Sequence, residues 1–312
     1  MDASLRRAAE QEMRRPAPDA PPGKRPRREC ADGAGSGFLE LGRFDYRAAD
    51  QLAQGAQGFI VTCGFQRGKS ATREAIAALE ETTTSLSSSA KPAFGIVKLP
   101  CLGVILLTWK ATQEADPSLP APSAVAAKLI HDVHSKKHPP LKHVQRITPV
   151  DGMCQTSTAA IRQLVTSLAK EFVTSQEPRS GEQLLSTEPG RSAPSGRPLL
   201  PFAVAFKSRS GEPQEPHRQE GSKGQALGDS QAESTSISRG AAIAAAAESF
   251  VAACKDAGID AKVNLIQPGA VVCLEILPVG SHTTAAIGIV DSKSCVLKPK
   301  LTMKALQLLA DN

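Results

Sequence analysis

Short apolar runs alternate along this chain with longer segments whose apolar residues recur every three or four positions. A short apolar run predicts a buried strand, whereas the longer spacing predicts an amphipathic helix. Alternation of the two predicts an α+β (mixed α/β) chain with helices packed on sheets. The predicted strands are GFIVTC (58–63), CLGVILLTWK (101–110), HVQRITPV (143–150), FAVAFK (202–207), AKVNL (261–265), AVVCLEI (270–276) and TAAIGIV (284–290).

Five segments carry the helical spacing, at residues 70–81, 123–137, 156–173, 239–258 and 301–310. Ser70 is the predicted N-cap of the first helix, and the polar run TTTSLSSSAKP after it is expected to break the pattern. Gly258 is placed to end the fourth helix, because glycine adopts the left-handed conformation that closes many helices. The third helix has a predicted buried stripe of Ile161, Leu164, Val165, Leu168 and Phe172.

Three segments are too polar to join a core. Residues 1–36 are rich in Pro, Gly, Ala and Arg, and residues 175–199 and 210–236 are rich in Ser, Gly, Glu and Pro. Segments of such composition bury too little apolar surface to offset the entropy of ordering. We therefore expect a disordered N-terminal tail and two flexible insertions.

The chain is basic, with a net charge of +6 over 312 residues. Residues 1–28 hold eight Lys and Arg against four Asp and Glu, so the tail alone contributes +4. The stretch KRPRR (Lys24 to Arg28) is typical both of a nuclear localisation signal and of a solvated basic arm. We expect a protein of the nucleus (nucleolus or nucleoplasm), with the cytoplasm as a further location. We find neither a secretory signal nor an apolar run long enough to cross a membrane.

Seven scattered cysteines form no C-x-x-C pair and no zinc-ligand spacing, which indicates reduced thiols that fill core positions. Only one Trp and one Tyr are present, so the chain lacks the aromatic platforms on which single-strand readers stack bases. We expect no metal and no cofactor.

No catalytic motif is evident. GFQRGKS (Gly64 to Ser70) follows a strand and opens a helix, but it is one residue short of a Walker-type phosphate loop. Lys69 remains a candidate phosphate contact at that helix N-terminus. The segment HDVHSKKHPPLKH (residues 131–143) carries four His, but its interleaved Lys136, Lys137 and Lys142 favour an anionic partner or a solvated loop over a metal.

Three blocks in this order resemble one family: RITPVDGMC (146–154), FAVAFKSRSG (202–211) and NLIQPGAVVCLEI (264–276). Together they resemble the THUMP domain, and most closely the THUMP-domain adaptors of tRNA cytidine acetylation. GFIVTC with its following helix resembles the module that precedes the THUMP domain there. The resemblance implies a tail at 1–36, a ferredoxin-like module beginning in 37–122 and a THUMP domain over 123–312.

The resemblance implies a protein that binds tRNA and does no chemistry itself. Such adaptors deliver serine and leucine tRNAs to an RNA cytidine acetyltransferase, which makes N4-acetylcytidine. The implied partners are therefore tRNA and that acetyltransferase, and we expect a monomer before the complex forms. An RNA-modifying enzyme that docks tRNA through a THUMP domain is one alternative, although we expect no catalytic domain beyond Asn312. A protein-interaction scaffold with incidental charge is the other.

The candidate RNA-binding residues are cations and one hydroxyl. Lys207 and Arg209 are two apart on a strand, so they are expected to project to one face, with Ser208 opposite. Two cations on one face can hold neighbouring phosphates, and RNA helices are recognised largely by shape and backbone. The same reasoning adds Arg146, Lys136, Lys137 and Lys142.

Overall fold

The computed structural model describes residues 55–87, 92–109, 119–175, 197–209, 237–279 and 282–307. The predicted N-terminal tail, the signal-like run Lys24 to Arg28 and nearly all of both predicted insertions lie outside these ranges. In the described part, four helices pack on a four-stranded and a five-stranded sheet, and a further two-stranded ladder lies near the end of the chain. The predicted α+β fold class is confirmed.

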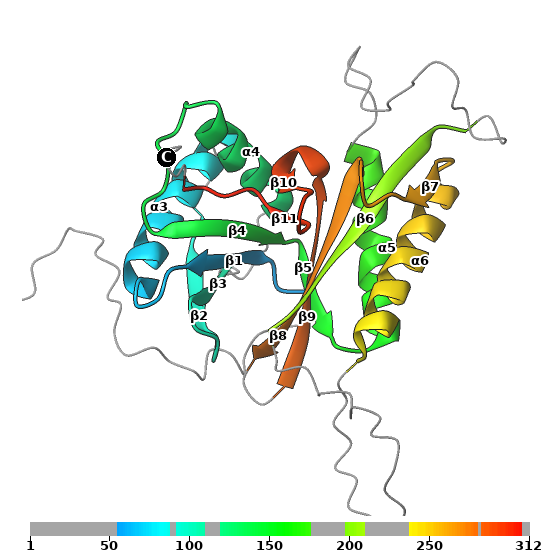
Figure 1. Cartoon of the computed structure of the whole chain (residues 1–312), viewed down its shortest axis with the longest axis horizontal. Helices are drawn as coiled ribbons and strands as arrows, with labels where there is room; N and C mark the ends of the chain where they lie inside the picture. The colour runs from blue at the N-terminus through cyan, green and yellow to red at the C-terminus, as the bar shows by residue number, and fades with distance from the viewer. Residues whose placement is uncertain are drawn as a thin grey trace, which may run out of the picture. The chain divides into compact units, whose positions relative to one another are not determined.

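The four-stranded sheet has the order β2-β3-β1-β4, and every neighbouring pair of strands is antiparallel. Its elements follow one another as βαββαβ, which is the ferredoxin-like arrangement. Figure 1 shows α3 and α4 on one face of this sheet. The elements are β1 (Gly58–Cys63), α3 (Gly68–Leu86), β2 (Phe94–Lys98), β3 (Val104–Trp109), α4 (Pro122–His134) and β4 (Val144–Val150).

Helix α4 and strand β4 complete this ferredoxin-like unit. The boundary expected between residues 122 and 123 therefore coincides with the start of α4, inside the unit rather than at its end. Strand β4 pairs with β1, and Val150 lies opposite Gly58. The next strand, β5, belongs to the other sheet, so the chain passes from one sheet to the other at Asp151.

The five-stranded sheet has the order β5-β9-β8-β6-β7. Strand β6 runs parallel to both β7 and β8, whereas β9 is antiparallel to β8 and β5. Helices α5 and α6 lie side by side on one face of it (Figure 1). The elements are β5 (Gly152–Gln155), α5 (Thr158–Ser175), β6 (Leu199–Ser208), α6 (Arg239–Asp256), β7 (Asp260–Val263), β8 (Ala270–Val279) and β9 (His282–Asp291).

The two faces of the five-stranded sheet have different partners. Alternate residues of β6, β8 and β9 pack under α5 and α6, where the rings of Phe202 and Phe250 are 4.6 Å apart. The opposite residues meet the ferredoxin-like unit. There, Leu277 and Ala286 share a buried cluster with Ile60 and Leu106. Residues that point from β6 toward this second face therefore lie near the junction of the two sheets.

After β9, a short 3-10 helix (Ser292–Ser294) leads into β10 (Cys295–Val296), which pairs with β11 (Thr302–Met303). The helix predicted over 301–310 is therefore wrong for the described residues 301–307. Met303 and Leu306 are buried against the ferredoxin-like unit, but the segment that carries them is extended and not helical. Leu306 N donates to the backbone oxygen of Gln145, so this segment covers the free edge of β4.

Two other local predictions differ from the structure. Helix α3 begins at Gly68, so Ser70 is its third residue and not its N-cap. The helix also continues through the run TTTSL, and strand β2 was not predicted. Gly258 closes α6 with a φ of +76°, as predicted.

None of the helices in the described ranges is long and apolar enough to cross a membrane.

Candidate nucleic-acid interface

The end of β6 carries the Lys-Ser-Arg sequence to the junction of the sheets. Lys207 lies opposite Glu275 on the parallel strand β8, and Ser208 lies opposite Ile276. The backbone N–H of Arg209 donates to Ile276 O at 2.8 Å, which extends the ladder by one residue beyond the strand. Because side chains alternate along a strand, Lys207 and Arg209 share the face that meets the ferredoxin-like unit. Half-buried Ser208 points to the opposite face.

Arg209 is held in an ion pair. Its Nε donates to Glu275 Oε2 at 2.6 Å, and the two side chains are only 9% and 8% exposed. The charge of Arg209 is therefore largely compensated inside the protein. Cys101, from the β2–β3 connection, lies beside this pair and donates its Sγ–H to the backbone oxygen of Arg209 at 3.5 Å. Arg209 thus joins the two sheets and is poorly placed to meet a phosphate directly.

Lys207, in contrast, is exposed and has no ion pair within the described residues. Partial desolvation lowers its pKa, and the positive charges of Arg209 and Arg146 lower it further, against the opposing effect of Glu275. The charges of Lys207 and Arg209 at the end of β6 and of Arg146 on β4 thus outnumber the one carboxylate, Glu275, that acts on Lys207. Such an excess of positive charge favours a bound anion.

Arg146 reaches this place from β4 of the other sheet. It is exposed, and its Nε donates to Met303 O at 3.0 Å. This bond ties the C-terminal segment to β4 and orients the guanidinium, whose remaining N–H groups can still donate. Nothing in the sequence spacing of residues 146 and 207 indicates that they meet.

Lys136, Lys137 and Lys142 lie on the connection between α4 and β4, and all three are exposed. Glu74 of α3 fixes the end of this connection. Its carboxylate accepts the backbone N–H groups of Lys142, His143 and Val144 at 2.5, 2.7 and 2.9 Å. Lys142 lies two residues before the start of β4, the strand that carries Arg146.

Lys69 is exposed in the first turn of α3, in which no acidic residue lies. It shares that helix with Glu74, five residues or about 7.5 Å along the axis at ~1.5 Å per residue. Lys69 thus lies on the element that fixes the lysine-rich connection. We define the basic margin as the exposed cations Lys136, Lys137, Lys142, Arg146 and Lys207.

The histidines of residues 131–143 take part in local contacts. His134 Nε2 lies 3.0 Å from Ala305 O, and His138 Nε2 lies 3.7 Å from a carboxylate oxygen of Glu81. Across the described residues, no group of three or more His, Cys, Asp and Glu is arranged to hold a metal ion.

The cysteines of the described ranges are unpaired thiols. Cys63, Cys254, Cys273 and Cys295 are buried, as expected for core positions, and Cys101 and Cys154 are half-buried. Burial raises the pKa of Cys154 and Cys254 to about 11, so both remain protonated at neutral pH. Protonated thiols are poor nucleophiles.

Glu275 and Glu74 are the partners that sequence reasoning missed. Glu275 interrupts the apolar run VVCLEI, and a carboxylate inside such a run is rarely buried without a cation. That pattern could have predicted a partner for Glu275. Glu74 has no such signal, because it lies on a half-buried helical position and its three partners are backbone groups.

No family model and no curated protein matches the chain. Among solved structures it is similar to PH1313 from Pyrococcus horikoshii Ot3, with 10% identity and a TM-score of 0.39; the alignment covers 75% of this chain and 55% of that one. It is also similar to a 4-thiouridine synthetase in a complex with RNA and bound ATP. That alignment has 12% identity and a TM-score of 0.33, and covers 76% of this chain and 42% of that one.

The chain thus spans about half the length of these two proteins. Both TM-scores are below 0.5.

Proposed function

We propose that this protein is a non-catalytic THUMP-type adaptor that binds tRNA and presents it to an RNA cytidine acetyltransferase, which forms N4-acetylcytidine. The tRNAs would be those for serine and leucine, and the protein would act in the nucleus as a monomer before it joins its partner. The acetylation role is proposed because the blocks 146–154, 202–211 and 264–276 resemble the THUMP-domain adaptors of tRNA cytidine acetylation.

The observation that carries the RNA-binding part is the electrostatic interaction between Lys207, at the end of β6, and Arg146 on β4, two exposed cations from different sheets. Two strands from different sheets supply exposed cations to one place, and Lys142 extends the positive charge along β4. Cations spread over several elements match the spaced phosphates of a folded RNA better than a single small anion. Contacts of this kind position an RNA without reading its sequence.

The test is a reconstituted acetylation reaction with purified acetyltransferase, acetyl-CoA, ATP and serine tRNA. We expect N4-acetylcytidine to form efficiently only when this chain is added, and the Lys142→Ala/Lys207→Ala variant to support much less product. The chain with tRNA and cofactors but without acetyltransferase should form none. Equal product with and without the chain would contradict the adaptor role, and modification by the chain alone would identify an enzyme.

A further inference from the structure

The segment after β9 is strongly basic. Residues 292–307, SKSCVLKPKLTMKALQ, contain Lys293, Lys298, Lys300 and Lys304 and no Asp or Glu. The acidic residue just before it, Asp291, accepts the backbone N–H of Lys293 at 2.8 Å and so caps the short 3-10 helix. Within the described residues, none of the four lysines forms an ion pair.

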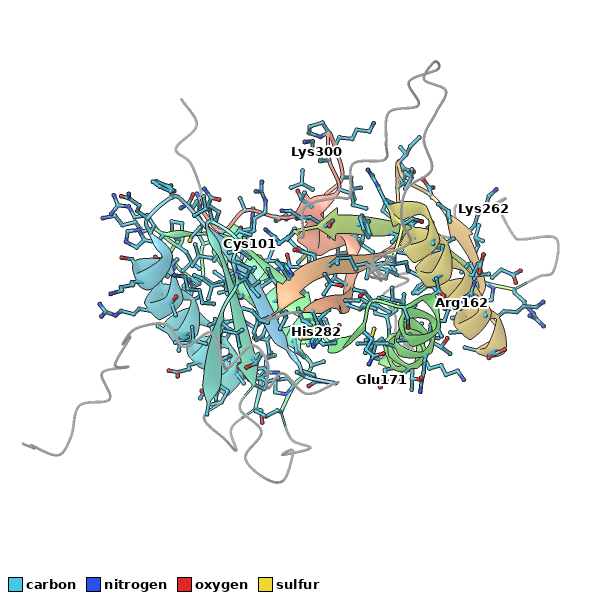
Figure 2. The ribbon with its side chains drawn as sticks, turned by 90° about the horizontal axis from the view of Figure 1, so that it is seen from below. Cys101, Arg162, Glu171, Lys262, His282 and Lys300 are labelled. Atoms are coloured by element: carbon cyan, nitrogen blue, oxygen red, sulfur yellow. The ribbon has the colours of Figure 1, made fainter. Side chains whose placement is uncertain are left out.

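Apolar contacts hold this segment against the core, while Lys293, Lys298 and Lys300 are exposed and Lys304 is half-buried. β10 and β11 pair at Cys295–Met303 and Val296–Thr302, and the five residues between them form the turn of a hairpin. Leu297 and Leu301, the first and last residues of that turn, pack against the core of the ferredoxin-like unit. Lys298 and Lys300 lie between these anchors and are exposed. Figure 2 shows Lys300 at the tip of the turn, pointing away from the body of the protein.

The base of the hairpin is bonded to the strand that carries the basic margin. Met303 O accepts from Arg146 Nε, and Leu306 N donates to Gln145 O at 2.9 Å. Just beyond, the side chain of Gln307 donates to Lys142 O at 2.8 Å. The hairpin is therefore held against β4 at several points, and its charges hold a fixed place relative to Arg146 and Lys142.

Uncompensated ammonium groups on an anchored turn suit a polyanion. Each lysine offers three N–H donors and a compact charge, without the planar fork with which arginine binds a single phosphate or carboxylate. Two lysines separated only by Pro299 can each meet a different phosphate of one backbone. Because Leu297 and Leu301 pack against the core, two of the three exposed residues between them are lysines, which favours a polyanion over an apolar groove as the partner.

We propose that the β10–β11 hairpin is a second RNA-contacting element, in which Lys298 and Lys300 bind the phosphate backbone of the RNA held by the basic margin. This inference rests on the proposed function, because it names a further contact to the same RNA. The RNA would then contact both the junction of the two sheets and the C-terminal segment beside β4.

The test compares full-length wild-type protein, Lys298→Ala/Lys300→Ala and the matched control Lys255→Ala/Lys262→Ala. The control removes the same charge from exposed lysines at the end of α6 and on β7. Lys262 pairs with Pro201, six residues before Lys207, or about 20 Å away at ~3.3 Å per residue. Binding of serine tRNA is measured by fluorescence anisotropy at several salt concentrations.

We expect the hairpin variant to bind about tenfold or more weakly at low salt, and its slope of log K against log salt to be smaller by about 2, since each phosphate contact contributes ~0.9. The control should keep the wild-type slope, and Lys298→Arg/Lys300→Arg should keep most of the affinity. A hairpin variant that matches the control, while wild type binds, overturns the hairpin contact and leaves RNA binding intact. Failure of wild type to bind overturns the proposed function and the hairpin contact together.

Discussion

At the scale of single residues, Asp151 lies where the chain passes from the four-stranded to the five-stranded sheet, and its buried carboxylate binds backbone groups of both parts. It is 8% exposed, and its two oxygens accept the backbone N–H groups of Ser123 at 2.8 Å and Ile289 at 3.0 Å. Ser123 lies in the first turn of α4, where N–H groups have no partner within the helix. Asp151 therefore caps α4 and binds β9 at once, which explains the acidic residue in the block RITPVDGMC.

Asp151→Asn should lower the free energy of unfolding by about 1–3 kcal/mol at neutral pH, because the amide has one acceptor oxygen for two buried donors. Urea denaturation measures the change. Asp256→Asn is the matched control, because Asp256 is exposed and its ion pair to Lys170 is 4.0 Å long. The control should stay within about 0.5 kcal/mol of wild type. Equal stability of the two variants would contradict the role of Asp151.

The penalty of Asp151→Asn should also depend on pH. Burial raises the pKa of Asp151 above its ordinary value of 3.8 despite the two N–H donors, so the folded state holds this proton to higher pH than the unfolded state. Stability from that proton is present below the unfolded pKa and is lost as pH rises through the folded pKa. The advantage of wild type over the variant should therefore shrink as pH rises from 4.5 to 7. An advantage that grew over this range would contradict a raised pKa.

At the scale of elements, the Arg209–Glu275 pair joins the end of β6 to β8. Arg209→Met should lower the free energy of unfolding by about 3–5 kcal/mol, because it removes the ion-pair partner of the buried Glu275 carboxylate. The double variant Arg209→Met/Glu275→Leu should recover much of that loss. Urea denaturation of the single and the double variant, with Arg162→Met as the control, measures the free energy of unfolding.

Arg162 suits that control because its pair with Glu248 is 2.8 Å long but the two side chains are 52% and 64% exposed. Exposed ion pairs contribute about 0–1 kcal/mol, so the control should change stability little. Suppose that Arg209→Met lowered the free energy of unfolding by no more than Arg162→Met does. The Arg209–Glu275 pair would then contribute no more than an exposed ion pair, and Arg209 would again be a candidate phosphate contact.

Element boundaries were harder to predict than element types. The run TTTSL was expected to break its helix, since threonine is a weak helix former. In the structure, Thr82 and Thr83 are buried, and their hydroxyls donate to the backbone oxygens of Ala78 and Leu79 at 2.7 Å. Packing thus overrides local propensity there. Strand β2 was missed because FGIVK is short and lies between prolines, so its burial depends on pairing with β3.

The C-terminal helix was predicted over residues 301–310, which include Leu301, Met303 and Leu306. These residues do contact the core, but the hairpin and the edge of β4 bury them in an extended segment. An apolar spacing therefore identified the buried residues without identifying their conformation, because two structures can place them against the same core. Nothing in the sequence indicated that the four lysines of residues 292–307 lie on or beside one structural element. The β10–β11 hairpin shows it.

At the scale of the whole molecule, the sequence indicated candidate cations for RNA binding, but not which of them are held in ion pairs. Strand alternation places Lys207 and Arg209 on one face, and the structure agrees. Whether each charge is compensated depends on Glu275 and Arg146, which come from other strands. That information lies in the order β5-β9-β8-β6-β7 and in the contact between the sheets, neither of which local patterns encode.

The most direct test of the account is tRNA binding by wild type and by Lys142→Ala/Lys207→Ala, at about 50 and 200 mM salt. Both lysines are exposed and unpaired among the described residues, so the variant should unfold at the wild-type temperature. We predict salt-sensitive binding by wild type, and for the variant binding that is at least about tenfold weaker and less dependent on salt by about two phosphate contacts. Equal binding by the folded variant, or binding that ignores salt, would contradict the claim that the basic margin holds RNA.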